Sequence, residues 1–151
     1  MTNIIDFQAE HKKAFKALNY AWLTKYFDVE PIDEMVLNNP IDQIIAKGGK
    51  IFVATSKTKV VGTVALINRD THFEISKMAV EESHQGKGIG SELMKHLLEW
   101  STENNIHYLQ LFSHSKLKAA LNLYKKFGFK DSKATNNLYS RADIVMELNL
   151  S

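Results

Sequence analysis

Gln85-Gly86-Lys87-Gly88-Ile89-Gly90 is the stretch that decides the fold, and it lies between a predicted strand and a predicted helix. Its three glycines at alternate positions let the backbone approach a ligand closely and adopt conformations that other residues avoid. The free N–H groups of the helix's first turn point to the same place, where the helix dipole favours an anion. The stretch therefore predicts a turn that binds a diphosphate, and Lys87 would add a positive charge.

Two better-known phosphate loops do not fit these residues. The dinucleotide pattern G-x-G-x-x-G lacks its third glycine, whether it is read from Gly86 or from Gly88. The nucleotide P-loop pattern G-x-x-x-x-G-K-S/T does not occur in the chain. A tight turn from strand to helix that holds no ligand stays open as the alternative at this point.

Residue spacing predicts the elements on both sides of the turn. Ile89, Leu93, Leu97 and Trp100 recur at helical spacing, which predicts a helix to about Asn104. Stretches rich in β-branched residues predict the strands Ile4–Phe7, Ile51–Thr55, Val60–Ile67, His72–Val80, Tyr108–Phe112 and Ile144–Leu148. Further helices are expected from about Glu10 to Phe27, around Met35 and Val36, from Asn39 (as N-cap) and Pro40 to Gly48-Gly49, and from Leu117 to Tyr124, before Gly128.

The order of these elements defines the fold class. Helices come first, an antiparallel meander of strands follows, and strand-helix-strand-helix-strand ends the chain. This order predicts a mixed α/β (α+β) fold. The chain contains no internal repeat and no linker rich in Pro, Gly or Ser, so one domain over residues 1–151 is expected.

Composition excludes several classes of function. The chain has 151 residues, 44% of them apolar and 24% charged, with a formal net charge of +2, so it has no broad field for nucleic acid. It contains no cysteine, and its six histidines lack metal-binding spacing, so neither a disulfide nor a metal site is expected. The first residues resemble no secretory signal, and the longest apolar stretch, Val60 to Ile67, is too short to cross a bilayer. A cytoplasmic protein without membrane contact is expected.

Glu74 is a candidate general base. It lies in an apolar or small-residue strand, and two-residue alternation places it on the same side as Ser76, Met78 and Val80. A carboxylate in a partly buried strand tends to have a raised pKa, which suits a base near neutral pH. A solvated strand face is the alternative for an isolated glutamate.

A second group, Tyr124-Lys125-Lys126-Phe127-Gly128-Phe129, ends the last predicted helix. On its own it reads as an aromatic pair packed in a core, with a glycine that stops the helix.

Taken together, these segments resemble the GCN5-related N-acetyltransferase (GNAT) superfamily. The residues Gln85–Gly90 match its signature Q/R-x-x-G-x-G/A, and Phe73–Val80 with the following helix is similar to its central motif. Downstream, Ala120–Phe129 resembles its motif A-x-x-L-Y-x-x-x-G-F. The resemblance is strong from about His72 to Phe129, and only topological before that.

The resemblance implies a mostly antiparallel mixed sheet whose fourth and fifth strands begin parallel and then splay apart around acetyl-CoA. The pantetheine arm would pair with the strand like an added strand, and the glycine turn would hold the diphosphate. The residues assigned to the cofactor are Met78, Ala79, Val80, Gln85, Gly86, Lys87, Gly88, Ile89, Gly90 and Ser91.

The resemblance also implies a catalytic pair and a direct attack of an amine on the thioester, without a metal. Tyr124 matches the tyrosine that in many members protonates the departing thiolate. Glu74 stands where one branch of the family carries its general base, whereas other members use a base relayed through water. One departure concerns Leu117, because many members have an asparagine at this position. The geometry after the fifth strand is therefore an open question.

The expected activity is acetyl transfer to a primary amine of a small molecule, amino acid or peptide. The main alternative is a non-catalytic CoA-binding sensor or interaction module, and a nucleotide-binding regulatory domain ranks last. A homodimer is also left open. The resemblance implies an acceptor pocket lined by Tyr20, Trp22, Tyr26, Phe27, Tyr139 and Arg141. Its aromatic residues favour an apolar or cationic acceptor, whereas Arg141 would pair with a carboxylate.

Overall fold

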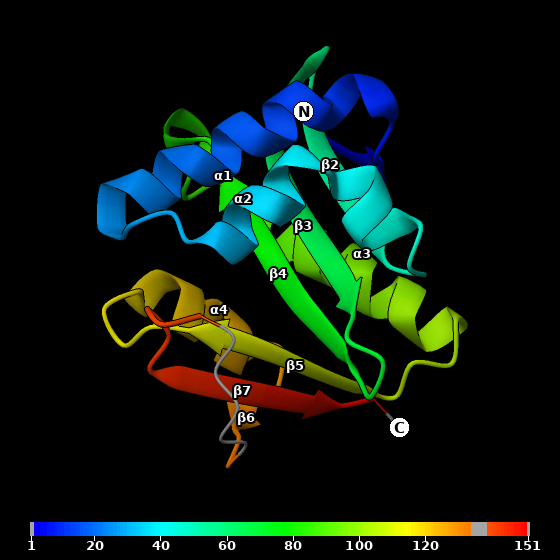
Figure 1. Cartoon of the computed structure of the whole chain (residues 1–151), viewed down its shortest axis with the longest axis vertical. Helices are drawn as coiled ribbons and strands as arrows, with labels where there is room; N and C mark the ends of the chain where they lie inside the picture. Colours follow the sequence, from blue (N-terminus) through cyan, green and yellow to red (C-terminus); the bar gives the residue numbers. More distant parts are fainter. Residues whose placement is uncertain (1, 134–138, 151) are drawn as a thin grey trace.

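A seven-stranded sheet in the order β1-β2-β3-β4-β5-β7-β6 forms the centre of the molecule (Figure 1). This computed structural model describes residues 2–133 and 139–150. The strands are β1 (Thr2–Asp6), β2 (Lys50–Ser56), β3 (Lys59–Asn68), β4 (Phe73–Val80), β5 (Tyr108–Ser113), β6 (Lys130–Asp131) and β7 (Ile144–Asn149). The helices are α1 (Lys12–Tyr26), α2 (Pro31–Asn38), α3 (Ile89–Glu103) and α4 (Lys118–Lys126), with short turns η1 (Ala9–His11), η2 (Ile41–Ile45) and η3 (Glu82–His84).

Two hydrophobic clusters cover the two faces of the sheet. On one face, α1 and α2 pack over β2 and β3 through buried residues such as Phe15, Leu23 and Leu37. On the other face, Leu93 and Leu97 of α3 pack with side chains of β2 to β5, and α4 adds partly buried residues. Figure 1 shows α1 and α2 on one side of β4 and α3 on the opposite side. Both faces of the central strands are therefore buried.

The strands β4 and β5 separate along part of their length and leave a gap in the sheet. They pair in parallel only from Phe73–Ile75 to Leu109–Leu111, whereas all other strand pairs are antiparallel. Beyond Ile75 the two strands diverge, as Figure 1 shows for the ends that point toward α1 and α4. The mixed sheet with splayed central strands predicted from the sequence is confirmed.

Most predicted elements are present within a few residues of their expected bounds. Two details differ: one short strand and one helix cap. The strand β6 was not predicted, because two residues carry no periodic signal. Asn39 was expected to cap the turn that follows it, but Pro40 occupies that position. The Asn39 side chain instead donates a hydrogen bond to the carbonyl of Met35 in α2.

A bulge in β4 overturns the expected side-chain alternation around Glu74. The register between β3 and β4 shifts between Thr63 and Ala65, and Lys77 adopts a left-handed backbone with φ of 54°. One extra residue in a strand reverses the side to which the following residues point. Met78 and Val80 therefore pack into the cluster around α3. The prediction that they share a face with Glu74 was wrong.

Across residues 2–133 and 139–150, no helix combines the length and apolar character needed to traverse a bilayer.

Candidate active site

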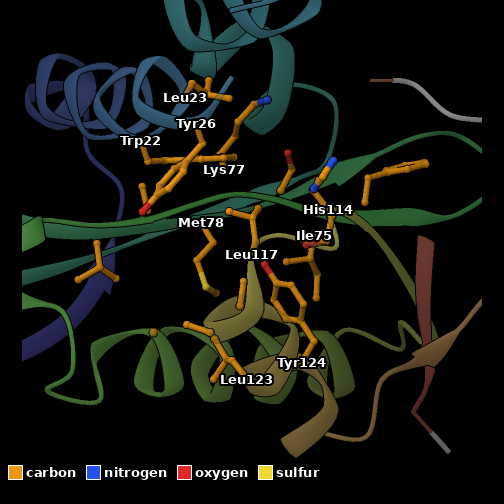
Figure 2. Close-up of a pocket in the computed structure, with 18 of the residues that line it drawn as sticks. Trp22, Leu23, Tyr26, Ile75, Lys77, Met78, His114, Leu117, Leu123 and Tyr124 are labelled. Atoms are coloured by element: carbon orange, nitrogen blue, oxygen red, sulfur yellow. The ribbon is translucent and has the colours of Figure 1, made fainter. Parts of the chain in front are cut away.

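The cleft between β4 and β5 is a cavity of about 690 Å³. Its walls come from β4, the glycine turn, the end of β5, α4, the end of α1 and the segment before β7. Figure 2 shows Tyr124 and Leu123 on one side of β4, and Trp22, Tyr26 and Lys77 on the other. The cavity therefore has one side near α3 and α4 and another near α1, called here the cofactor side and the acceptor side after the roles that the resemblance implies.

The glycine turn places an open helix N-terminus at the cavity. Gly88 is the N-cap of α3 in the left-handed conformation (φ 82°), and no side chain caps the helix. Gly86 also has a positive φ, of 79°, and a Cβ built on either glycine would meet no atom within 4 Å. The first N–H groups of a helix have no partner within it, so this turn offers free donors to an anion. The cradle fits a diphosphate.

The open edge of β4 continues from this cradle. Val80 and Ala79 pair with β3 on one side, but no residue of β5 pairs with them on the other. The side chain of Gln85 donates to the carbonyl of Val80 (3.1 Å) and ties the turn to the strand end. Of the residues that the sequence assigned to the cofactor, all except Lys87 line the cavity.

Tyr124 reaches the cavity from α4, and Figure 2 shows its phenol directed toward β4. Its ring packs edge-on against Phe129 at 6.0 Å, as expected for an aromatic pair. None of the described residues forms a hydrogen bond with its hydroxyl, and burial raises the pKa of the Tyr124 phenol to about 12. The phenol therefore stays protonated at neutral pH and keeps its O–H free as a donor.

Glu74 lines the same cavity, but its carboxylate already has two donors. Arg69 Nε donates to Oε1 (2.8 Å), and the Tyr139 hydroxyl donates to Oε2 (3.0 Å). Glu74 is 1% exposed, so the alternative of a solvated strand face is wrong. Burial, together with the charge of Glu74, raises the pKa of the Tyr139 phenol. The Tyr139 hydroxyl therefore keeps its proton at neutral pH and donates it in a hydrogen bond to Glu74.

A buried ionic cluster lies beside Glu74 on the same face of β4. Lys77 Nζ contacts Asp33 Oδ1 at 3.0 Å, and Arg141 binds both oxygens of Asp33, at 2.7 and 2.9 Å. Glu30 accepts a further hydrogen bond from Arg141 at 2.8 Å. Burial opposes the charge of Asp33, but the hydrogen bonds from Arg141 and the charge of Lys77 outweigh it, so the pKa of Asp33 is lowered. Burial also lowers the pKa of Lys77, against the effect of Asp33.

This cluster was not predicted from the sequence. Asp33 and Arg141 are more than 100 residues apart, and no local pattern marks such a pair. Arg141 was expected to be available to a substrate carboxylate, but the protein's own carboxylates already bind it.

A chain of buried hydrogen bonds connects the acceptor wall to the bulge. Trp22 Nε1 donates to Asn19 Oδ1 (3.4 Å), and Asn19 Nδ2 donates to Thr63 Oγ1 (3.2 Å). Thr63 Oγ1 in turn donates to the carbonyl of Lys77 (2.9 Å). Asn19 and Thr63 are fully buried, so the bonds that Thr63 makes to Asn19 and to Lys77 have little competition from water. They fix the bulge that turns Met78 toward the cofactor side.

The loop after β5 is held without the asparagine that many GNAT members carry. Leu117 stands at that position and lines the cavity. His114 Nδ1 accepts from the backbone N–H of Lys116 (3.0 Å), while Asp143 accepts from the backbone and hydroxyl of Ser115 (2.8 and 2.7 Å). The hydrogen bonds from the Ser115 hydroxyl and backbone lower the pKa of Asp143. Together with the bond to His114, they anchor the loop.

The acceptor side is aromatic, as the sequence suggested, with one exception. Trp22, Tyr26, Phe27 and Tyr139 line the cavity. Tyr20 was expected there, but it packs against the cluster beneath α1 and α2. No group of three potential metal ligands occurs within the described residues.

Comparisons with known proteins agree with this geometry. The model of the family described as "Acetyltransferase (GNAT) family" matches residues 13–129. An uncharacterized N-acetyltransferase, YobR of Bacillus subtilis, is 37% identical over 68 residues, which is 45% of this chain and 27% of that protein. N-acetylaspartate synthetase of Xenopus tropicalis is 30% identical over 75% of this chain and 40% of its own length. The bS18-alanine N-acetyltransferase of Escherichia coli is 29% identical over 59% and 62%.

The chain thus spans between 27% and 62% of the length of these three relatives.

Solved structures share its fold over nearly the whole chain. A GNAT acetyltransferase of Staphylococcus aureus Mu50 has a TM-score of 0.90 with 21% identity, covering 100% of both chains. YncA of Salmonella typhimurium, solved with acetyl-CoA, has a TM-score of 0.80 with 21% identity, covering 100% of this chain and 95% of that one. With the family model matching residues 13–129, the chain belongs to the GNAT family of acetyltransferases.

Proposed function

We propose that this chain is an acetyl-CoA-dependent N-acetyltransferase that moves an acetyl group to a primary amine by direct attack. The observation that carries the proposal is one cavity that contains both an open helix N-terminus and a protonated tyrosine. Gly86 and Gly88 leave room for a diphosphate at one end, and Tyr124 lies further along the same cavity. A CoA-binding module without catalysis would need the first feature but not the second.

Acetyl-CoA would supply a thioester carbonyl for the amine and a thiolate as leaving group. The turn's N–H groups would bind its diphosphate, and the open edge of β4 at Met78–Val80 would pair with its pantetheine arm. Tyr124 would donate its proton toward sulfur, since its hydroxyl has no partner among the described residues. No metal is needed for these roles.

Glu74 is proposed as the base that receives the amine's proton. Both of its oxygens already accept hydrogen bonds, from Arg69 and from the Tyr139 hydroxyl. A proton would therefore reach Glu74 through the Tyr139 hydroxyl or a water molecule, rather than by direct contact with the amine.

A thiol-release assay tests the proposed function. The protein is incubated with acetyl-CoA and a panel of amines, amino acids and peptides, and free CoA is measured. Isothermal calorimetry with acetyl-CoA is run in parallel. Binding with turnover of at least one amine supports the enzyme. Binding without turnover across the panel supports the CoA-binding module, and absence of binding contradicts both.

Substitution of Glu74 by glutamine is expected to lower kcat/KM on the order of 100-fold, the lower end of the effect of a general base. The loss should be seen across the pH profile, because glutamine keeps the shape of the side chain but cannot accept the amine's proton. The profile of kcat/KM from about pH 5 to 9 measures this. Glu147→Gln is the matched control, since Glu147 also accepts a hydrogen bond from a tyrosine, Tyr108. A Glu74→Gln enzyme with the wild-type kcat/KM assigns the base to another group.

The remaining properties stay predictions from the sequence. These are a single domain over residues 1–151, a cytoplasmic location, no contact with membrane or nucleic acid, and the option of a homodimer.

A further inference from the structure

The acceptor side of the cavity offers aromatic surface to a substrate. Trp22 and Phe27 pack edge-on at 6.1 Å, and Phe112 and Tyr139 do so at 5.6 Å. Tyr26 is 44% exposed, although it lines the cavity. Such rings bind apolar groups by area and by edge-to-face contacts.

The charged side chains around Glu74 and Lys77 form a group of three cations and three carboxylates. Arg69 pairs with Glu74, Lys77 pairs with Asp33, and Arg141 binds both Asp33 and Glu30. All four ion-pair contacts are between 2.7 and 3.0 Å. Lys77 and Arg141 also lie over the Tyr139 ring, at 5.1 and 4.6 Å. Within the described part of the chain, each of these cations is therefore neutralised by the protein itself.

A substrate carboxylate would have to compete with these internal partners. To bind Arg141 or Lys77, it would displace Asp33, whose side chain is 0% exposed. A buried carboxylate that loses its partners is strongly destabilised. Lys116 and Lys118 also line the cavity, and the Lys116 ammonium already donates to the Tyr26 carbonyl at 2.8 Å and lies 4.2 Å from the Phe27 ring.

We infer that the acceptor is a primary amine on an aromatic or aliphatic group, with no carboxylate beside the amine. Arylalkylamines and the free N-terminus of a peptide share this chemistry, whereas free amino acids do not. The inference rests on the proposed function for the transfer itself, but it concerns recognition and can be measured without turnover.

The test compares three ligands that differ around one amine: phenethylamine, phenylalanine, and a tripeptide amide that begins with phenylalanine. Their binding to the protein saturated with CoA is measured by calorimetry. Phenethylamine or the tripeptide is expected to bind at least about tenfold more tightly than phenylalanine, because only phenylalanine brings an unpaired carboxylate into the site. The affinities of phenethylamine and the tripeptide then show whether the acceptor is a small arylalkylamine or a peptide N-terminus.

A charge substitution weakens the preference if the inference is correct. Glu30→Gln keeps an oxygen for Ser140, which donates to Glu30 Oε1 at 2.9 and 3.0 Å, but it removes one negative charge from Arg141. The ratio of phenethylamine to phenylalanine affinity is expected to fall by about threefold or more in this variant. Glu82→Gln is the matched control, because Glu82 pairs with Lys25 outside the cavity lining and should leave the ratio unchanged.

Each result decides the inference separately from the function. Phenylalanine that binds the wild type as tightly as the other ligands overturns the inference, and so does a ratio that Glu30→Gln leaves unchanged. Absence of binding by phenethylamine and the tripeptide overturns it as well. Tight binding of either ligand without acetyl transfer supports the inference but contradicts the proposed function.

Discussion

Gly88→Val is expected to weaken acetyl-CoA binding by about 100-fold or more, the largest binding effect of any single substitution at this site. Gly88 has a φ of 82°, which a β-branched residue rarely adopts, and it caps a helix whose first N–H groups carry no other cap. The valine would also project into the open space in front of the turn. The loss of one or two hydrogen bonds to a charged diphosphate costs about 3 kcal/mol, equivalent to a factor of about 100 in affinity.

The measurement is calorimetry of acetyl-CoA binding, with thermal unfolding as a check of the fold. Gly48→Val is the matched control, because Gly48 also has a positive φ, of 91°, but does not line the cavity. Both variants should unfold at a lower temperature, while only Gly88→Val should lose affinity. If Gly48→Val loses affinity to the same extent, the effect is one of stability, and the turn is not the diphosphate site.

The glycine turn and its neighbours could be predicted because their signals are local. Gln85–Gly90 encodes both the positive φ angles and the uncapped helix start within six residues. The resemblance of Ala120–Phe129 to one short GNAT motif implied the position of Tyr124. The β-branched residues of β3 and the helical spacing of apolar residues in α3 predicted the bounds of both elements to within a few residues. Local conformation and period thus fixed the cofactor side of the cleft.

The strand face and the ion pairs of the acceptor side could not be predicted, because they depend on contacts between distant segments. The face of β4 that carries Glu74 was misassigned beyond Ser76, since a bulge at Lys77 leaves no mark in strand periodicity. The bulge is held by Thr63, from the neighbouring strand, and by Asn19, from α1. None of these residues carries a local sequence signal that marks the bulge. Only the folded chain brings them together.

The same argument applies to charge. The sequence shows that Arg141 is cationic but not that Asp33 and Glu30 bind it, more than 100 positions away. A free arginine and a neutralised one favour opposite classes of acceptor. The inference on the acceptor therefore needed the structure.

Tyr124→Phe is expected to lower kcat on the order of 100-fold while the KM for acetyl-CoA changes little. The phenylalanine keeps the edge-on contact with Phe129 but lacks the hydroxyl that would donate to the leaving sulfur, and loss of a general acid costs this much or more.

The shape of the pH profile gives a sharper test of the same role. Because burial raises the pKa of Tyr124 to about 12, its phenol does not ionise in the working range. The substitution should therefore lower the whole kcat profile between about pH 6 and 9 without moving either limb. Tyr108→Phe, which removes the hydrogen bond to Glu147 on the far strands, is the matched control and should leave kcat unchanged. A Tyr124→Phe enzyme with the wild-type rate would remove the acid role, and a displaced limb would mean that the tyrosine acts by perturbing another titrating group.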